Sequence, residues 1–127
     1  MAGPAAAGAL IYAKDLDRLS AFYRQLLAME LLHGSAELAV LESPAFQLLI
    51  HAIPPQYAKD ISISSPPARR ENCAIKLFFT VPDLAAAGAL AGRLGGELFD
   101  EEWQGPGFVV RNAMDPEGNV FQLRQNH

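Results

Sequence analysis

The chain has 127 residues, half of them hydrophobic and 19% charged, with a formal net charge of -4 and a pI near 5.2. The acidic balance argues against a nucleic-acid partner, and no apolar run is long enough to span a bilayer. The single cysteine, Cys73, excludes an internal disulfide, fits a reducing cytoplasm and is expected to be buried or half-buried. We therefore expect a cytoplasmic protein with no membrane partner, folded as one domain over residues 1–127.

The first half of the chain predicts a strand, a helix and three further strands. Met1 to Ala9 is small and uncharged, unlike a signal peptide, and predicts an unstructured lead-in. A β-rich run then ends at Asp15, a natural helix N-cap. Apolar residues with a 3.6-residue period follow at Leu16, Leu19, Phe22, Tyr23 and Leu26. The strands are expected at about Met29–His33, Glu37–Leu41 and Phe46–Ala52.

The middle of the chain predicts a connection between two modules. Residues 54–72 are rich in proline, serine and charge, which is typical of a linker or a lid. A short helical turn is expected at Gln56 to Asp60. The first module is thus predicted at about residues 8–53 and the second at 73–127.

The second module repeats the first at an offset of 68 residues. Phe78–Leu84 aligns with Leu10–Leu16, Asp83 takes the N-cap position, and Gly95-Gly96 ends the helix. The helical stripe is Leu84, Ala87, Leu90 and Leu94. The later strands are expected at about Glu97–Phe99, Phe108–Ala113 and Val120–Arg124, with a loop over Asp100–Gly107. Each half is therefore predicted to be βαβββ.

Asp115-Pro116-Glu117-Gly118-Asn119 is the most informative local motif. Proline presets φ at the first corner, glycine accepts the left-handed conformation, and the Asp and Asn side chains can bond the local backbone. Apolar residues flank the motif on both sides. It predicts the tip of a β-hairpin.

The two βαβββ halves, the paired Asp-Leu helix starts and the closing Asp-Pro-Glu-Gly-Asn turn resemble the vicinal oxygen chelate superfamily. That superfamily includes glyoxalase I, extradiol dioxygenases, and fosfomycin- and bleomycin-resistance proteins. The resemblance covers nearly the whole chain. It implies an α+β fold whose two mixed sheets curl around a shared cavity with the helices outside. It also implies a homodimer.

In the metal-binding members the resemblance implies four ligand positions. They correspond here to Gly8, Leu49, Lys76 and Gln122. None is a usual strong ligand, since a divalent ion favours carboxylate or imidazole groups and a fixed cation repels it. The histidines (His33, His51 and His127) have no metal-binding spacing. We predict no metal and no cofactor.

Strand alternation predicts which side chains face the cavity. Ile75, Leu77, Phe79 and Val81 form an apolar face for packing under a helix, so Lys76, Phe78 and Thr80 face the other way. A simple hairpin register adds Phe108, Val110 and Asn112, whereas a bulge adds Arg111 instead. Trp103 is expected to overhang the cavity mouth or to fill a dimer interface. The predicted ligand-binding residues are Tyr12, Leu49, His51, Lys76, Phe78, Trp103, Phe108, Gln122 and Arg124.

Lys76 admits three interpretations. Its stem packs along Phe78 with the ammonium in solvent, or its ammonium anchors a ligand carboxylate or phosphate, or it is a nucleophile activated by burial. The leading function is metal-independent binding of a small neutral or anionic aromatic or apolar molecule, on a bleomycin-resistance-like scaffold. The alternatives are a metal-dependent glyoxalase-type lyase or dioxygenase with non-standard ligands, a metal-free enzyme using Lys76, Tyr12 or His51, and a regulatory dimer without a ligand. No catalytic residue is assigned.

Overall fold

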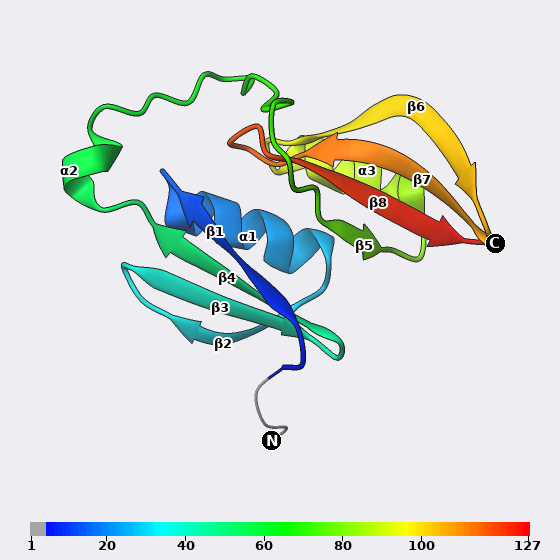
Figure 1. Ribbon diagram of the computed structural model, residues 1–127, viewed down its shortest axis with the longest axis horizontal. Coiled ribbons are helices and arrows are strands. Elements are labelled where there is room, and N and C mark those ends of the chain that lie inside the picture. The colour runs from blue at the N-terminus through cyan, green and yellow to red at the C-terminus, as the bar shows by residue number, and fades with distance from the viewer. Residues whose placement is uncertain (1–4) are drawn as a thin grey trace. The chain divides into compact units, whose positions relative to one another are not determined.

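Two compact units make up the chain, Met1–Ile63 and Ser64–His127, and each contains a four-stranded mixed sheet and a longer helix. The computed structural model describes residues 5–127 (Figure 1). The predicted α+β fold of two βαβββ modules is confirmed. That the two sheets share one cavity stays a prediction. Part of the expected lead-in lies outside the described residues, and its last two residues belong to the first strand.

The first unit places a helix on one face of its sheet. Its elements are β1 (Gly8–Ala13), α1 (Leu16–Leu26), β2 (Glu30–Gly34), β3 (Leu38–Ser43), β4 (Phe46–Ala52) and α2 (Pro55–Ala58). The strand order is β1-β4-β3-β2, with β1 parallel to β4 and the other pairs antiparallel. Helix α1 packs on this sheet through the periodic residues that the sequence identified. Leu19, Phe22, Leu41, Leu48 and Ile50 have no exposed surface.

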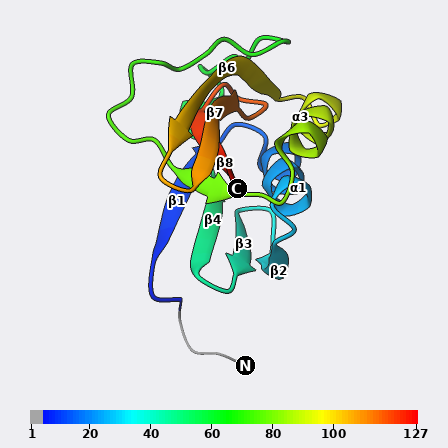
Figure 2. The ribbon, with the colours of Figure 1, turned by 90° about the vertical axis from the view of Figure 1, so that its right-hand side faces the viewer.

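The second unit repeats this arrangement. Its elements are β5 (Phe78–Thr80), α3 (Leu84–Arg93), β6 (Glu97–Gly105), β7 (Phe108–Met114) and β8 (Val120–Asn126). The order is β5-β8-β7-β6, with β5 parallel to β8. Figure 2 shows α3 along one face of the sheet. Phe79 on β5 and Phe121 on β8 form an edge-to-face pair whose ring centroids lie 6.1 Å apart. Among the described residues, no helix is long and apolar enough to cross a membrane.

Both long helices begin at the aspartates expected to cap them. Asp15 Oδ1 accepts a hydrogen bond from the Arg18 backbone N–H at 3.1 Å. Asp83 Oδ1 accepts from Ala85 at 2.9 Å and from Ala86 at 3.2 Å. Each side chain thus satisfies backbone donors that have no partner within the helix.

The closing turn is the hairpin tip that the sequence predicts. The Asp115 carboxylate accepts hydrogen bonds from the backbone of Glu117 (2.9 Å) and Asn119 (3.1 Å), and from the Asn119 side chain (2.8 Å). Gly118 has a φ of 84°, which glycine adopts at little cost. The Asp115 side chain is fully buried, so its bonds hold the turn in an environment without water.

The predicted linker divides between the two units. Helix α2 and the residues to Ile63 belong to the first unit, and Ser64–Asn72 belongs to the second. There the Arg70 backbone N–H donates to the carbonyl of Gly118 at 2.9 Å, and Arg70 Nε donates to the carbonyl of Glu117 at 3.1 Å. Residues 64–72 are therefore attached to the closing turn.

Two local predictions for the second unit are wrong. The segment expected as a loop over Asp100–Gly107 is mostly strand, because β6 continues to Gly105 and pairs with β7 beyond an irregularity between Leu98 and Glu102. An edge strand tolerates charged residues on its exposed side, and so its acidic run resembles a loop in sequence.

The strand before Asp83 is also shorter than expected. Ile75 is 79% exposed rather than packed under a helix, and Cys73 is exposed rather than buried. Arg70 holds the chain at the closing turn. Pairing with β8 begins at Leu77, whose carbonyl accepts a hydrogen bond from the Gln122 backbone N–H at 2.9 Å. Between these two attachments the chain makes no ladder and does not alternate in burial.

Candidate functional site

The predicted ligand-binding residues of the first unit lie on the face of its sheet opposite α1. Leu10 pairs with Leu49 and Tyr12 with His51 across the parallel strands β1 and β4. Opposite residues in a ladder share a face. Their neighbours Leu48 and Ile50 are fully buried on the helix side, whereas Tyr12 is 57% exposed. The first sheet therefore gathers Tyr12, Leu49 and His51 on one uncovered face.

Tyr12 and His51 form a ring contact on this face. Their ring centroids lie 5.5 Å apart, and His51 Nδ1 lies 2.7 Å from the carbonyl oxygen of Ala52. Because a carbonyl only accepts, Nδ1 carries the proton in the neutral ring and Nε2 keeps a lone pair. In the neutral ring, His51 therefore keeps Nε2 as an acceptor, and its ring contacts that of Tyr12.

The second sheet has an equivalent uncovered face, here called the open face and defined as the side opposite α3. Gln122 pairs with Phe78 on β5 and with Asn112 on β7, and Arg124 pairs with Val110. The hairpin therefore has the simple register, and the irregularity lies in β6. The open face consists of Phe78, Thr80, Trp103, Phe108, Val110, Asn112, Val120, Gln122 and Arg124.

Arg124 is held between two aromatic rings on the open face. Its guanidinium carbon lies 3.7 Å from the Phe78 ring centroid and 4.3 Å from that of Phe108. Such stacking orients the planar guanidinium and leaves its edges for hydrogen bonds. Three predicted ligand-binding residues thus form one cluster.

Trp103 lies in a strand and not in the predicted loop. It is opposite Val110 in the β6–β7 ladder, which places it on the open face, and it is 42% exposed. Phe78 is 53% exposed on the same face. The open face thus exposes two large aromatic side chains.

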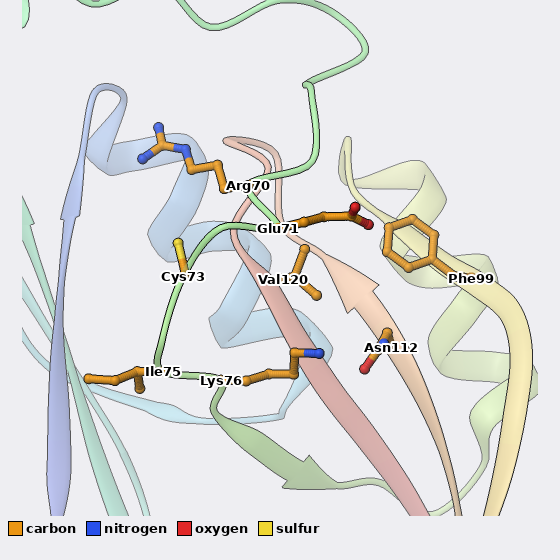
Figure 3. A pocket seen from close by; sticks show the side chains of 8 residues that line it. All are labelled: Arg70, Glu71, Cys73, Ile75, Lys76, Phe99, Asn112 and Val120. Atoms are coloured by element: carbon orange, nitrogen blue, oxygen red, sulfur yellow. The ribbon is translucent and has the colours of Figure 1, made fainter.

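A pocket of about 120 Å³ lies at the closing-turn end of the open face (Figure 3). It is lined by Arg70, Glu71, Cys73, Ile75, Lys76, Phe99, Asn112 and Val120. The Lys76 side chain extends from the segment before β5 toward β8, on the side where Asn112 lies. Within residues 5–127 its ammonium forms no hydrogen bond or ion pair.

The residues of the linker that line this pocket were not predicted from the sequence. Glu71 lines the pocket and is paired with Arg69 at 3.1 Å, while the Arg69 guanidinium lies 3.3 Å from the Phe99 ring centroid. These contacts arise because Arg70 attaches the linker to the closing turn. No local sequence pattern indicates that residues 64–72 attach to the closing turn.

The four positions implied for a metal do not fit a divalent ion. Leu49 offers no ligand atom, Lys76 is a cation and Gln122 is an amide. At Gly8 the backbone oxygen of Gln47 fills the space that a β-carbon would need, so no ligand side chain fits there without a shift of β4. Among the described residues, no group of three His, Cys, Asp or Glu side chains converges.

The paired modules and their uncovered sheet faces define a vicinal oxygen chelate protein. A family model described as a glyoxalase-like domain matches residues 9–124. The chain belongs to this glyoxalase-like family. A search of the curated proteins gives no match.

Solved structures with the same fold come from several bacteria and from a transposon. One is a glyoxalase/bleomycin resistance protein/dioxygenase family enzyme from Burkholderia phytofirmans PsJN, 18% identical, with a TM-score of 0.68 over 94% of this chain and 97% of that chain. A glyoxalase/bleomycin resistance protein from Albidiferax ferrireducens T118 is 17% identical, with a TM-score of 0.67 over 95% of this chain and 98% of that chain. The bleomycin resistance determinant of transposon Tn5 is 20% identical, with a TM-score of 0.60 over 94% of this chain and 96% of that chain. At these identities the similarity concerns the fold.

Proposed function

We propose that the protein binds a small neutral or anionic aromatic or apolar molecule without a metal ion. The observation that carries this proposal is the open face of the second sheet. There the rings of Phe78 and Phe108 contact the guanidinium of Arg124, and the neighbouring Gln122 is an amide where a metal-dependent relative would have a carboxylate or imidazole group. Concave apolar surfaces with a few polar groups are the usual form of a small-molecule site.

The charges near the pocket favour an anionic ligand over a cationic one. Lys76 and Arg70 line it, and Arg124 lies further along the same sheet. The carboxylate of Glu71 is already paired with Arg69. A cationic drug would therefore meet net positive charge, and we expect weak binding of bleomycin itself.

We further propose that the binding form is a homodimer, as the superfamily resemblance implies. Native mass spectrometry of the purified full chain tests metal, retained ligand and subunit count together. The expected result is a dimer without stoichiometric metal that gains mass on addition of small aromatic acids. Zinc, nickel, manganese or iron at full occupancy would contradict metal-independent binding and revive the lyase or dioxygenase alternative.

The role of Lys76 is tested by Lys76→Met. If the ammonium anchors the ligand, affinity for benzoate falls about tenfold, the size expected for one charge-assisted hydrogen bond. Lys59→Met removes a lysine that is also exposed, from the first unit, and serves as the matched control. Unchanged affinity in Lys76→Met leaves the lysine as a solvated side chain.

A second candidate function is acid–base chemistry without a metal. It is favoured by the ring contact between Tyr12 and His51 and by the hydrogen bond that places the proton of the neutral His51 ring on Nδ1. An imidazole with a fixed tautomer is a competent general base. For a compound that binds and is converted, His51→Gln should abolish turnover and leave binding intact. Loss of both together would assign His51 to binding.

A further inference from the structure

Two buried polar atoms on the open face lack hydrogen-bond partners. Across residues 5–127, the buried side-chain atoms in this state are Asn112 Oδ1 and Arg124 Nε. Buried polar groups in folded proteins are nearly always satisfied, and exceptions often mark a place that a ligand or water completes. One atom is an acceptor and the other a donor.

The hairpin register places these two residues side by side. Asn112 pairs with Gln122 and Arg124 pairs with Val110, so Asn112 and Arg124 are diagonal neighbours on one face. Diagonal neighbours in an antiparallel ladder lie about 7–8 Å apart. A single small molecule of that length can therefore span both positions.

Arg124 is arranged to bind a carboxylate. Phe78 and Phe108 cover its guanidinium and fix its plane, so the unsatisfied Nε–H is left at the guanidinium edge. Within the described residues, no Asp or Glu forms an ion pair with Arg124, whereas Arg69 pairs with Glu71 and Arg111 with Asp100. A planar carboxylate matches this edge in both geometry and charge.

Asn112 requires the opposite kind of group. Its unsatisfied oxygen accepts a hydrogen bond, so the ligand atom next to it must be an N–H or O–H donor. Asn112 lies in the pocket of about 120 Å³, and a cavity of about 150 Å³ is enough to hold benzene. The pocket therefore has room for the edge of one substituted ring.

Resting on the proposed binding function, we propose that the ligand is a single-ring aromatic carboxylate that also carries a hydroxyl or amino group. The carboxylate binds Arg124 and the hydroxyl or amino group donates to Asn112. The group next to Asn112 is a donor and not a second carboxylate, because a carboxylate would place acceptor oxygens against the unsatisfied Asn112 oxygen. The two unpartnered atoms thus define both ends of the ligand.

Ligand titrations with the full chain test this assignment. Trp103 is the single tryptophan and lies on the same face, so its fluorescence should report binding alongside calorimetry. We expect 4-hydroxybenzoate to bind more tightly than phenol by about 10- to 100-fold, and more tightly than 4-methoxybenzoate by about tenfold. Terephthalate binding more tightly than 4-hydroxybenzoate would overturn the role given to Asn112.

Matched variants separate the two ends. Arg124→Met should remove the preference for 4-hydroxybenzoate over phenol, whereas Arg93→Met, at an exposed position in α3, should not. Asn112→Leu should remove the preference over 4-methoxybenzoate and leave benzoate affinity unchanged. Both preferences persisting in these variants would overturn the proposal.

Stability of the free protein gives a test that needs no ligand. An unsatisfied polar atom opposes folding, so Asn112→Leu should unfold at the same temperature as the parent or at a higher one. A large drop in the unfolding temperature would show that Asn112 is structural and would overturn its role. If neutral aromatics bind as tightly as the acids, this inference fails and the binding function stands. If no aromatic compound binds, the binding function itself fails.

Discussion

The carbonyl oxygen of Ala68 occupies the space that a β-carbon on Gly118 would require. The linker can approach the closing turn this closely only because the turn has a glycine at that position. The contact is reinforced by the bond from the Arg70 backbone to the Gly118 carbonyl. One glycine therefore serves both the hairpin tip and the segment that lines the pocket.

Gly118→Ala should be strongly destabilising. A left-handed alanine costs about 1–2 kcal/mol, and the clash with Ala68 adds about 1–3 kcal/mol of overpacking. Gly107→Ala is the matched control, because Gly107 has a φ of 82° and open space where the alanine β-carbon would lie. Urea unfolding of both variants measures the difference. Equal losses would show that the linker does not press on the turn.

Asp115→Asn should weaken the closing turn while keeping its shape. The carboxylate accepts from two backbone N–H groups and from the Asn119 amide, and an amide group has only one oxygen to accept with. Leaving a buried donor unsatisfied costs about 1–3 kcal/mol, which is the loss we expect in the free energy of unfolding. Asp60→Asn, at an exposed position, should change stability little.

Gly8→Ala and Gly92→Ala should have opposite effects. The first places a β-carbon against the Gln47 backbone oxygen and should destabilise by about 1–3 kcal/mol. The second lies in α3 with open space around it and should stabilise by up to about 1 kcal/mol, the helix propensity difference. Thermal unfolding of the two variants measures this. A neutral Gly8→Ala would mean that the site has room for a ligand side chain after all.

Ala28→Gly should stabilise the first unit. Ala28 follows α1 with a φ of 50°, a conformation in which a β-carbon is strained, and its side chain is exposed. Relief of this strain is worth about 1 kcal/mol after the extra flexibility of glycine in the unfolded chain is subtracted. Ala89→Gly, inside α3, should instead cost about 1 kcal/mol. The same shift in both variants would contradict a conformational origin.

Elements with strong local signals were predictable from the sequence. The two capping aspartates, the glycines that end α3 and the closing turn depend on residues within a few positions of one another. The loop predicted over Asp100–Gly107 was wrong, because β6 is an exposed edge strand whose charged residues give it the composition of a loop. The strand before Asp83 was predicted to be too long, because its apolar alternation already begins at Ile75, before the ladder with β8 starts at Phe78.

The sequence by itself determined the modules, the alternating faces of β1, β4 and β8, and the absence of usual ligand types at the implied metal positions. These follow from strict periods of 2 and 3.6 residues and from side-chain chemistry. Only the tertiary structure decided that Arg124 lies between Phe78 and Phe108 and that Arg70 brings the linker to the pocket. Those contacts join segments far apart in the chain, and they depend on strand register and on backbone attachments that no local pattern encodes.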